Sequence, residues 1–204
     1  MALFQLPTPP EGLSLKEYFE NWLPGQLGEI SPVLKENAPD IKFGISFKAE
    51  GEEGGEWTIL VKEGEIKTEP GLSEGANLCI VLPAKGLQEV IMGRRPLFMG
   101  MRRGGAGAGE IKPEKMVKQF KKMTETLKEI QGMVEFKLTG GEEFWARINF
   151  GPLQEEPTVS ISISESDFQA MQKGELDPQT AFMSGKVQIS GDLSFLFKLA
   201  PLMM

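Results

Sequence analysis

The chain has 204 residues, of which 40% are hydrophobic and 25% are charged, and it carries a net charge of −7 at neutral pH. This length allows one large hydrophobic core or two small ones. The acidic balance argues against nucleic acid as a partner, because proteins bind it chiefly by neutralising phosphates with Lys and Arg. The single cysteine, Cys79, cannot form an internal disulfide.

Histidine is absent from the chain. Its absence removes the commonest general base and a frequent zinc ligand. Any catalytic mechanism would depend on carboxylates, lysine or the lone thiol. We therefore expect no cofactor and no metal.

The N-terminal residues 1–13 are expected to form an irregular arm, because Pro7, Pro9 and Pro10 interrupt regular structure. They contain neither a basic region nor a long apolar core, so we expect no signal peptide. No run of residues approaches the ~20 apolar residues that span a bilayer. Together with the absence of disulfides, these features predict a cytoplasmic protein.

The first helix is predicted to begin at Ser14, which forms a capping-box pattern with Glu17. Its apolar residues recur at helical spacing as far as Leu23, and the pair Pro24-Gly25 is expected to end it. Ser31-Pro32 predicts the start of a second short helix.

Alternating apolar residues then predict strands near residues 43–47, 57–61 and 76–82. The segment EGEEGG between the first two is expected to form a hairpin loop. A short helix is expected over residues 85–92.

The segment RRGGAGAG, residues 102–109, has the composition of a flexible linker. Its glycines do not form a dinucleotide-binding fingerprint, because Glu110 stands where the last glycine would be. A phosphate-binding nest is the alternative, but flexibility is the reading that we favour.

Pro113 opens a long amphipathic helix that is expected to end at Gly132. Its apolar residues step by four and three positions along one stripe, which is typical of a core-facing helix: Met116, Phe120, Met123, Leu127 and Ile130. Strands are expected over residues 134–138, 144–150 and 159–163. Ser164 and Asp167 then predict the start of another helix.

The last thirty residues predict a capped helix, a strand and an apolar terminal helix. Asp177-Pro178 suits a helix start, and Gly185 allows the chain to turn into the strand. The residues after Gly191-Asp192 are almost entirely apolar, so the terminal helix requires a large apolar surface to pack against.

This ordered pattern resembles the end of the sterol carrier protein 2 (SCP2-like) family, over roughly the last ninety residues. The residues that carry the resemblance are Gly174, Asp177-Pro178, Ala181-Phe182-Met183, Gly185-Lys186 and Gly191-Asp192. It implies an α+β fold in which helices cover one face of an antiparallel sheet. It also implies a non-catalytic lipid-binding and lipid-transport protein, with a tunnel between sheet and helices for a sterol, fatty acyl chain or phospholipid.

On this resemblance, twelve apolar residues are predicted to line the ligand site. They are Phe136, Phe144, Ile148, Ile161, Phe168, Met171, Phe182, Met183, Leu193, Leu196, Phe197 and Leu199. The abundance of Met and Phe is compatible with an adaptable cavity. The alternative is that these residues fill a solid core.

The two halves of the chain follow the same plan, which predicts a tandem repeat. Leu78 and Ile80 map onto Val159 and Ile161 by adding 81, whereas Trp57 maps onto Trp145 by adding 88. We therefore expect a degenerate SCP2-like module at 14–103, the linker at 104–109 and a second SCP2-like module at 110–204. The first module lacks the closing strand and helix.

The segment from Arg94 to Lys122 contains nine basic and two acidic residues. It is either a solvated surface or a contact for anionic membrane headgroups or an acyl phosphate. The alternative function is a protein-interaction module that presents acyl substrates to a partner enzyme. An enzyme using Glu175, Asp177 and Lys186 ranks third, because Asp177 is already explained as a helix cap. The sequence leaves the oligomeric state open.

Overall fold

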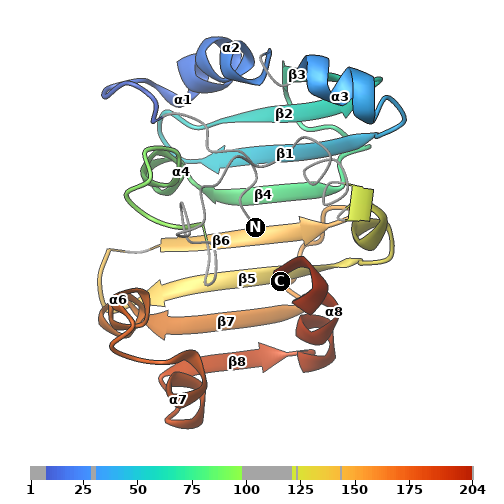
Figure 1. The fold of residues 1–204 in the computed structure, drawn as a ribbon. Coiled ribbons are helices and arrows are strands. Elements are labelled where there is room, and N and C mark those ends of the chain that lie inside the picture. Colours follow the sequence, from blue (N-terminus) through green and yellow to red (C-terminus); the bar gives the residue numbers. More distant parts are fainter. Residues whose placement is uncertain (1–7, 29–30, 98–120, 123, 143, 204) are drawn as a thin grey trace.

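One eight-stranded sheet runs through the chain (Figure 1), in the order β3-β2-β1-β4-β6-β5-β7-β8. The computed structural model describes residues 8–28, 31–97, 121–122, 124–142 and 144–203. The strands are β1 Phe43–Glu50, β2 Gly55–Lys62, β3 Glu65–Pro70, β4 Leu78–Pro83, β5 Gly132–Thr139, β6 Phe144–Phe150, β7 Val159–Ser164 and β8 Val187–Gly191. The helices are α1 Leu15–Glu17, η1 Tyr18–Trp22, α2 Leu23–Gly28, α3 Ser31–Asn37, α4 Ala84–Ile91, α6 Glu165–Lys173, α7 Pro178–Met183 and α8 Leu193–Met203.

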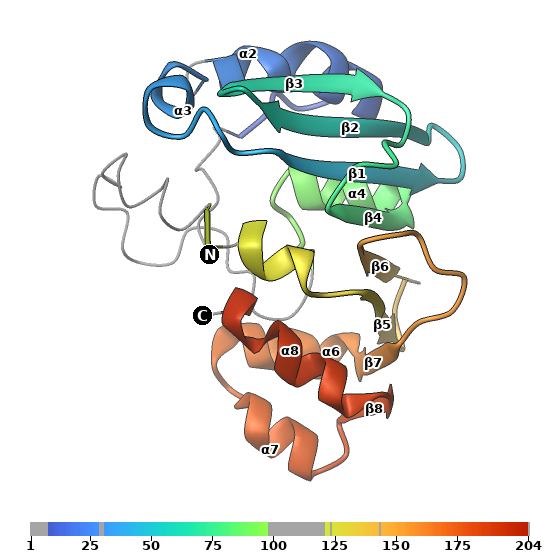
Figure 2. The same ribbon diagram turned by 90° about the vertical axis from the view of Figure 1, so that its right-hand side faces the viewer.

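The helices lie on one face of the sheet (Figure 2), which confirms the predicted α+β architecture. The sheet is mixed, however, and not purely antiparallel. Strand β1 pairs in parallel with β4, and β5 pairs in parallel with β7, while the other neighbours are antiparallel. In the second half the chain forms the β5–β6 hairpin and then crosses over to place β7 beside β5. In the first half β3 follows the β1–β2 hairpin before the chain crosses over to place β4 beside β1. Parallel neighbours require crossover connections of this kind.

The strand pairings of the two halves correspond. Strands β2-β1-β4 of the first half have the same order and directions as β6-β5-β7 of the second. Leu78 lies beside Ile45 as Val159 lies beside Val134, so these two residues occupy matching positions. The division into modules at 14–103 and 110–204 stays a prediction, and the linker at 104–109 lies outside the described residues.

The predicted match of Trp57 with Trp145 is wrong by one position. Trp57 lies opposite Phe47, and the matching residue of β5, Phe136, lies opposite Ala146. Trp57 is buried under the helices, where its ring stacks on that of Phe19 at 4.8 Å. A shift of one residue in a strand changes the face of the sheet, so Trp145 lies on the other side.

Each half has one strand without a counterpart among the described residues of the other half. Strand β3 extends the first half beyond β2, and β8 extends the second half beyond β7. The sequence analysis did not predict β3, because three of its six residues, EIKTEP, are charged and it has no alternation of apolar side chains. Its one local signal was Glu63-Gly64, whose φ angles of 54° and 74° form the type of two-residue turn that joins hairpin strands. At the centre of the sheet, β4 and β6 pair directly and join the halves.

The first helical segment differs from the prediction at its end. The capping box at Ser14 and Glu17 is present, as expected. Pro24-Gly25 does not stop the helix, which continues as α2 to Gly28. The preceding turn, η1, is a π-helix in which the Leu23 N–H donates to Tyr18 O. A widened turn is one of the adjustments that accommodates a proline inside a helix. Of the long helix predicted after Pro113, residues 121–122 and 124–128 are described and are helical.

The face of the sheet opposite the helices is polar. Its most buried charged group is Glu135, whose carboxylate accepts hydrogen bonds from Arg147 Nε at 3.0 Å, from Ser160 Oγ at 3.2 Å, and from Lys137 Nζ at 2.7 Å. Burial alone raises the pKa of this carboxyl, but the hydrogen bonds from Lys137 and Arg147 outweigh burial and hold the pKa below its ordinary value of 4.5.

The two halves are also joined above the sheet, on the helix side. Arg95 follows α4, and its Nε donates to Glu89 of that helix at 2.8 Å. Its NH2 group donates to Glu165 of α6 at 3.2 Å, and its guanidinium lies 4.8 Å from the centre of the Phe144 ring. Arg95 therefore bridges α4 of the first half to β6 and α6 of the second.

Replacing Glu135 by Gln is expected to lower the free energy of unfolding near neutral pH by about 1.5–3 kcal/mol, because hydrogen bonds to a charged group are lost. A group whose pKa is lowered by folding stabilises the fold above its unfolded-state pKa, and this contribution is lost as the pH falls through the folded-state pKa. The free energies of unfolding of wild type and Glu135→Gln should therefore become more similar below about pH 4.5. Urea unfolding across this range measures it.

Glu56→Gln is the matched control, because Glu56 lies on the same face but is exposed and pairs with Lys48 at 3.6 Å. Its effect should be small at every pH. Equal losses for the two variants would contradict the role given to Glu135.

Arg95→Met should destabilise the protein by about 1.5–3 kcal/mol, because it leaves two partly buried carboxylates without their shared cation. Arg94→Met is the control, since Arg94 is exposed and pairs only loosely with Glu11, at 3.7 Å. Thermal and urea unfolding of both variants measure the difference. If the two variants unfold alike, Arg95 does not join the halves as described.

Candidate functional site

The buried part of the predicted site lies between the sheet and the helices of the C-terminal half. Six of the twelve predicted residues are buried there: Phe136, Phe144, Ile148, Ile161, Phe168 and Leu199. Phe136 is the centre of this group, with ring centres 5.6 Å from Phe168 and 6.5 Å from Phe144. Strands β5, β6 and β7 thus bring together residues that are far apart in sequence.

Two helix caps fix the helices over this apolar layer. The Ser164 side chain accepts from the Asp167 N–H at 3.1 Å and starts α6, as predicted. The Asp177 carboxylate accepts from the N–H groups of Gln179 and Thr180 and starts α7, also as predicted. The hydrogen bond from the Thr180 hydroxyl is the main cause that lowers the pKa of Asp177.

Two of the three residues of the third-ranked enzyme hypothesis, Asp177 and Lys186, have structural partners. Asp177 is occupied as a cap, and Lys186 pairs with Asp167. Cys79 is buried, and burial is the main cause that raises the pKa of its thiol to about 11, so the nucleophilic thiolate is scarce at neutral pH. In the described part of the chain no group of three or more Cys, Asp or Glu side chains is placed to hold a metal.

The other six predicted residues lie further out. Met171 and Leu196 are half-buried, together with Leu176, Ile189 and Leu202, which the sequence prediction did not include. Phe182 and Met183 of α7 are 49% and 77% exposed, and Leu193 and Phe197 of α8 are 48% and 78% exposed. The structure therefore arranges the twelve residues as a buried layer, a half-buried ring and an exposed rim, and their role in binding stays a prediction.

Helix α8 is held to the sheet by Phe195, a buried residue that the prediction omitted. Its ring lies 6.0 Å from that of Phe150 and fills the space above Gly132. A Cβ atom at Gly132 would lie 2.5 Å from the Phe195 ring. The sequence identified Gly132 only as a helix end, whereas its lack of a side chain is what lets α8 approach β5 this closely.

The basic segment is only partly described. Arg95 is largely buried, where it pairs with Glu89 and Glu165, and the predicted membrane contact of this segment stays a prediction. Lys121 pairs with Asp40 at 3.1 Å. The basic residues between 98 and 120 lie outside the described residues.

The structure also has a hollow outside the predicted site. An open hollow of about 370 Å³ lies in the other half, between α3 and β3, and charged residues contribute to its lining: Gly28, Ser31, Pro32, Lys35, Glu65, Ile66 and Lys67. This lining does not suit an apolar ligand.

None of the described helices is both long and apolar enough to cross a membrane.

The fold and the apolar layer define an α+β domain with one helix-covered sheet face. Residues 114–204 match the SCP-2 sterol transfer family, and the chain therefore contains an SCP2-like domain. The family is one of lipid binding and transfer in general. The sequence resemblance predicted this family correctly.

The chain is 34% identical over 86 residues to hydroxysteroid dehydrogenase-like protein 2 of Bos taurus, covering 38% of this chain and 21% of that protein. It is 26% identical over 194 residues to sterol carrier protein 2 of Gallus gallus, covering 72% of this chain and 36% of that protein. It thus spans about a third or less of these relatives. A solution structure of sterol carrier protein domain 2 from Helicoverpa armigera aligns with 38% of this chain and 70% of its own, at 30% identity and a TM-score of 0.31.

Gly132→Ala should push the Phe195 ring off the sheet and loosen α8. Overpacking of this kind typically costs about 1–3 kcal/mol. Gly140→Ala is the control, because Gly140 also has a positive φ of 79° but nothing within 4 Å of an added Cβ. Hydrogen exchange of α8 amides should rise in the first variant only. Unchanged exchange in Gly132→Ala would mean that this contact does not fix the helix.

Proposed function

We propose that the protein binds a long-chain hydrophobic ligand, such as a sterol, fatty acyl chain or phospholipid, in its C-terminal half and transfers it without chemical change. The observation that carries the proposal is the graded apolar surface between sheet and helices. It passes from buried Phe136 and Phe168, through half-buried Met171 and Leu196, to exposed Phe197. Apolar side chains therefore extend from the core of this half towards its surface, and such a lining suits an apolar ligand.

The proposal is supported by the match of residues 114–204 to the SCP-2 sterol transfer family. The half-buried residues include a methionine and three leucines, whose unbranched or γ-branched side chains can change rotamer as a ligand enters. Transfer without turnover is supported by the absence of histidine from the chain and by the structural use of Asp177 and Lys186.

Met171→Trp tests the location of the ligand. Met171 lies on α6 at the half-buried ring, so a larger ring there should occupy the ligand's path and weaken binding by at least about tenfold, which corresponds to about 1.4 kcal/mol. The melting temperature should hold, because the added ring fills space that the ligand otherwise takes. Titration with a fluorescent long-chain fatty acid, together with circular dichroism, measures both effects.

Val90→Trp is the matched control, because Val90 is the half-buried residue at the corresponding place on α4, in the other half. Lipid binding by this variant should equal that of wild type. The lipid recovered after incubation should also have an unchanged mass. Wild-type binding by Met171→Trp would place the ligand elsewhere, and a cleaved or modified lipid would show that the protein is an enzyme.

A further inference from the structure

The two outer edges of the sheet differ in how they are protected. Strand β3 carries alternating charges and ends in Pro70, and its Ile66 N–H donates to Ser31 Oγ of α3 at 3.3 Å. Glu65 at its start pairs with Lys67 at 2.9 Å and with Lys35 of α3 at 3.5 Å. Charges, proline and a covering helix are the features by which sheet edges avoid pairing with other chains.

Strand β8 lacks the charges and the proline along its length. Its five residues, Val187–Gly191, include no charge and no proline, and among the described residues β7 is its only neighbour in the sheet. The Asp192 N–H donates to Thr158 O at 2.9 Å. This bond shows which residues of β8 are hydrogen-bonded to β7: every second residue counted back from Asp192, namely Ser190 and Gln188. In an antiparallel ladder every second residue turns its N–H and C=O away from the neighbouring strand. The backbone groups of Val187, Ile189 and Gly191 therefore point outward.

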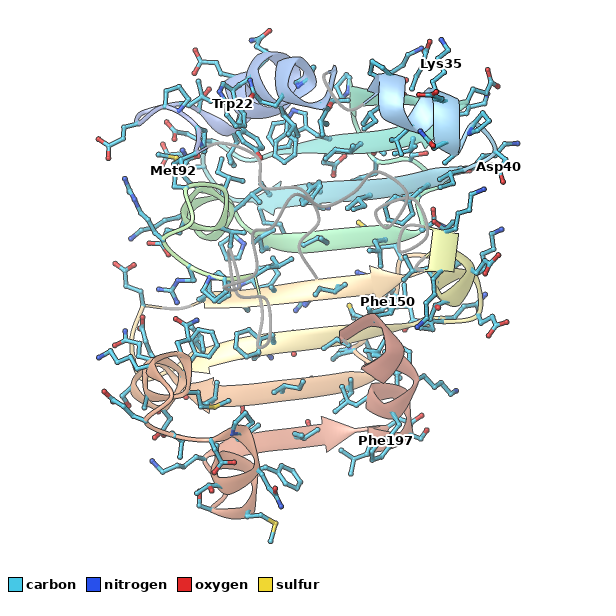
Figure 3. The ribbon with its side chains drawn as sticks, viewed as in Figure 1. Trp22, Lys35, Asp40, Met92, Phe150 and Phe197 are labelled. Carbon is cyan, nitrogen blue, oxygen red and sulfur yellow. The ribbon has the colours of Figure 1, made fainter. Side chains whose placement is uncertain are left out.

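Exposed apolar side chains flank this edge at both ends. Helix α7 precedes β8 and presents Phe182 and Met183, while α8 follows it and presents Leu193 and Phe197. Both helices lie on the same face of the sheet (Figure 2), and Phe197 lies beside the end of β8 (Figure 3). These four side chains and the β8 edge together are called the β8 surface below.

We propose that the β8 surface is an interface for a second copy of this chain, formed by antiparallel pairing of β8 with β8 of the partner subunit. The surface is complementary to itself under a two-fold axis through Ile189 and perpendicular to the sheet. This axis places α7 of one copy beside α8 of the other, so Phe182 and Met183 face the partner's Leu193 and Phe197. It also places the exposed Gln188 opposite Ser190 of the partner subunit, on the polar face.

A second copy fits this surface better than a lipid surface does. The outward N–H and C=O groups of β8 require hydrogen-bond partners, which another strand supplies and lipid chains do not. Asp177 and Asp192 also stand at the starts of the two flanking helices, where they would oppose anionic headgroups. Antiparallel pairing of two strands is, moreover, how β4 and β6 already join the halves of this chain.

Charge substitutions at Gln188 and Ser190 test the pairing. The variant Gln188→Lys/Ser190→Lys places lysines opposite lysines across the axis, and Gln188→Glu/Ser190→Glu places like carboxylates there. The dimer dissociation constant of each variant should be at least about tenfold higher than that of wild type, because like charges directly opposite one another destabilise a strand pair. An equimolar mixture of the two variants should recover association as a heterodimer. Sedimentation equilibrium over a range of concentrations measures all three.

The apolar rim has its own control. Phe197→Ser should weaken dimerisation, whereas Leu153→Ser should not, because Leu153 is 57% exposed but lies on the loop between β6 and β7. Circular dichroism checks that each variant is folded. A wild-type chain that stays monomeric at every concentration overturns the proposal, including the case in which it binds phosphatidylcholine vesicles through Phe197. A dimer that is indifferent to the charges at 188 and 190 overturns it as well.

Discussion

The pairing of β4 with β6 is the constraint on which the rest of the structure depends. Four Cα pairs, from Leu78 opposite Phe150 to Val81 opposite Arg147, make one sheet out of two similar halves. Each half has a strand edge at this point that would otherwise be open, and buried backbone groups at an open edge are costly. Arg95 then fixes the helices of both halves relative to that junction. The apolar layer of the C-terminal half is bounded by β6, and the outer edge of β6 is paired with β4 of the other half.

The two faces of the sheet differ in the side chains that they carry. The helix side gathers Phe136, Phe168 and Phe195 into the layer from which the proposed ligand path leads outward. The opposite side is polar, and there Glu135 of β5 accepts hydrogen bonds from three donors, two of them on the neighbouring strands β6 and β7.

Sequence patterns predicted most elements of the fold because their local signals were strong. The caps at Ser14, Ser164 and Asp177 are determined by side chains within three residues of the groups that they bind. The charged strand β3 has no apolar alternation, and the helix through Pro24 depends on a π-turn that no local rule indicated. Of the site, the six buried residues followed from alternation along β5, β6 and β7 and from the apolar spacing of the helices. Phe195 and the exposure of Phe197 could not be predicted, because they depend on how α8 rotates when it docks above Gly132.

The unmatched strands β3 and β8 also restrict how this chain can change over generations. In the second half, β4 occupies the position that a strand equivalent to β3 would need, and in the first half β6 occupies the position of an equivalent of β8. A strand added at either of these places would have to compete with the opposite half for the same backbone groups. Neither half can therefore extend its sheet on the inner side without separating β4 from β6.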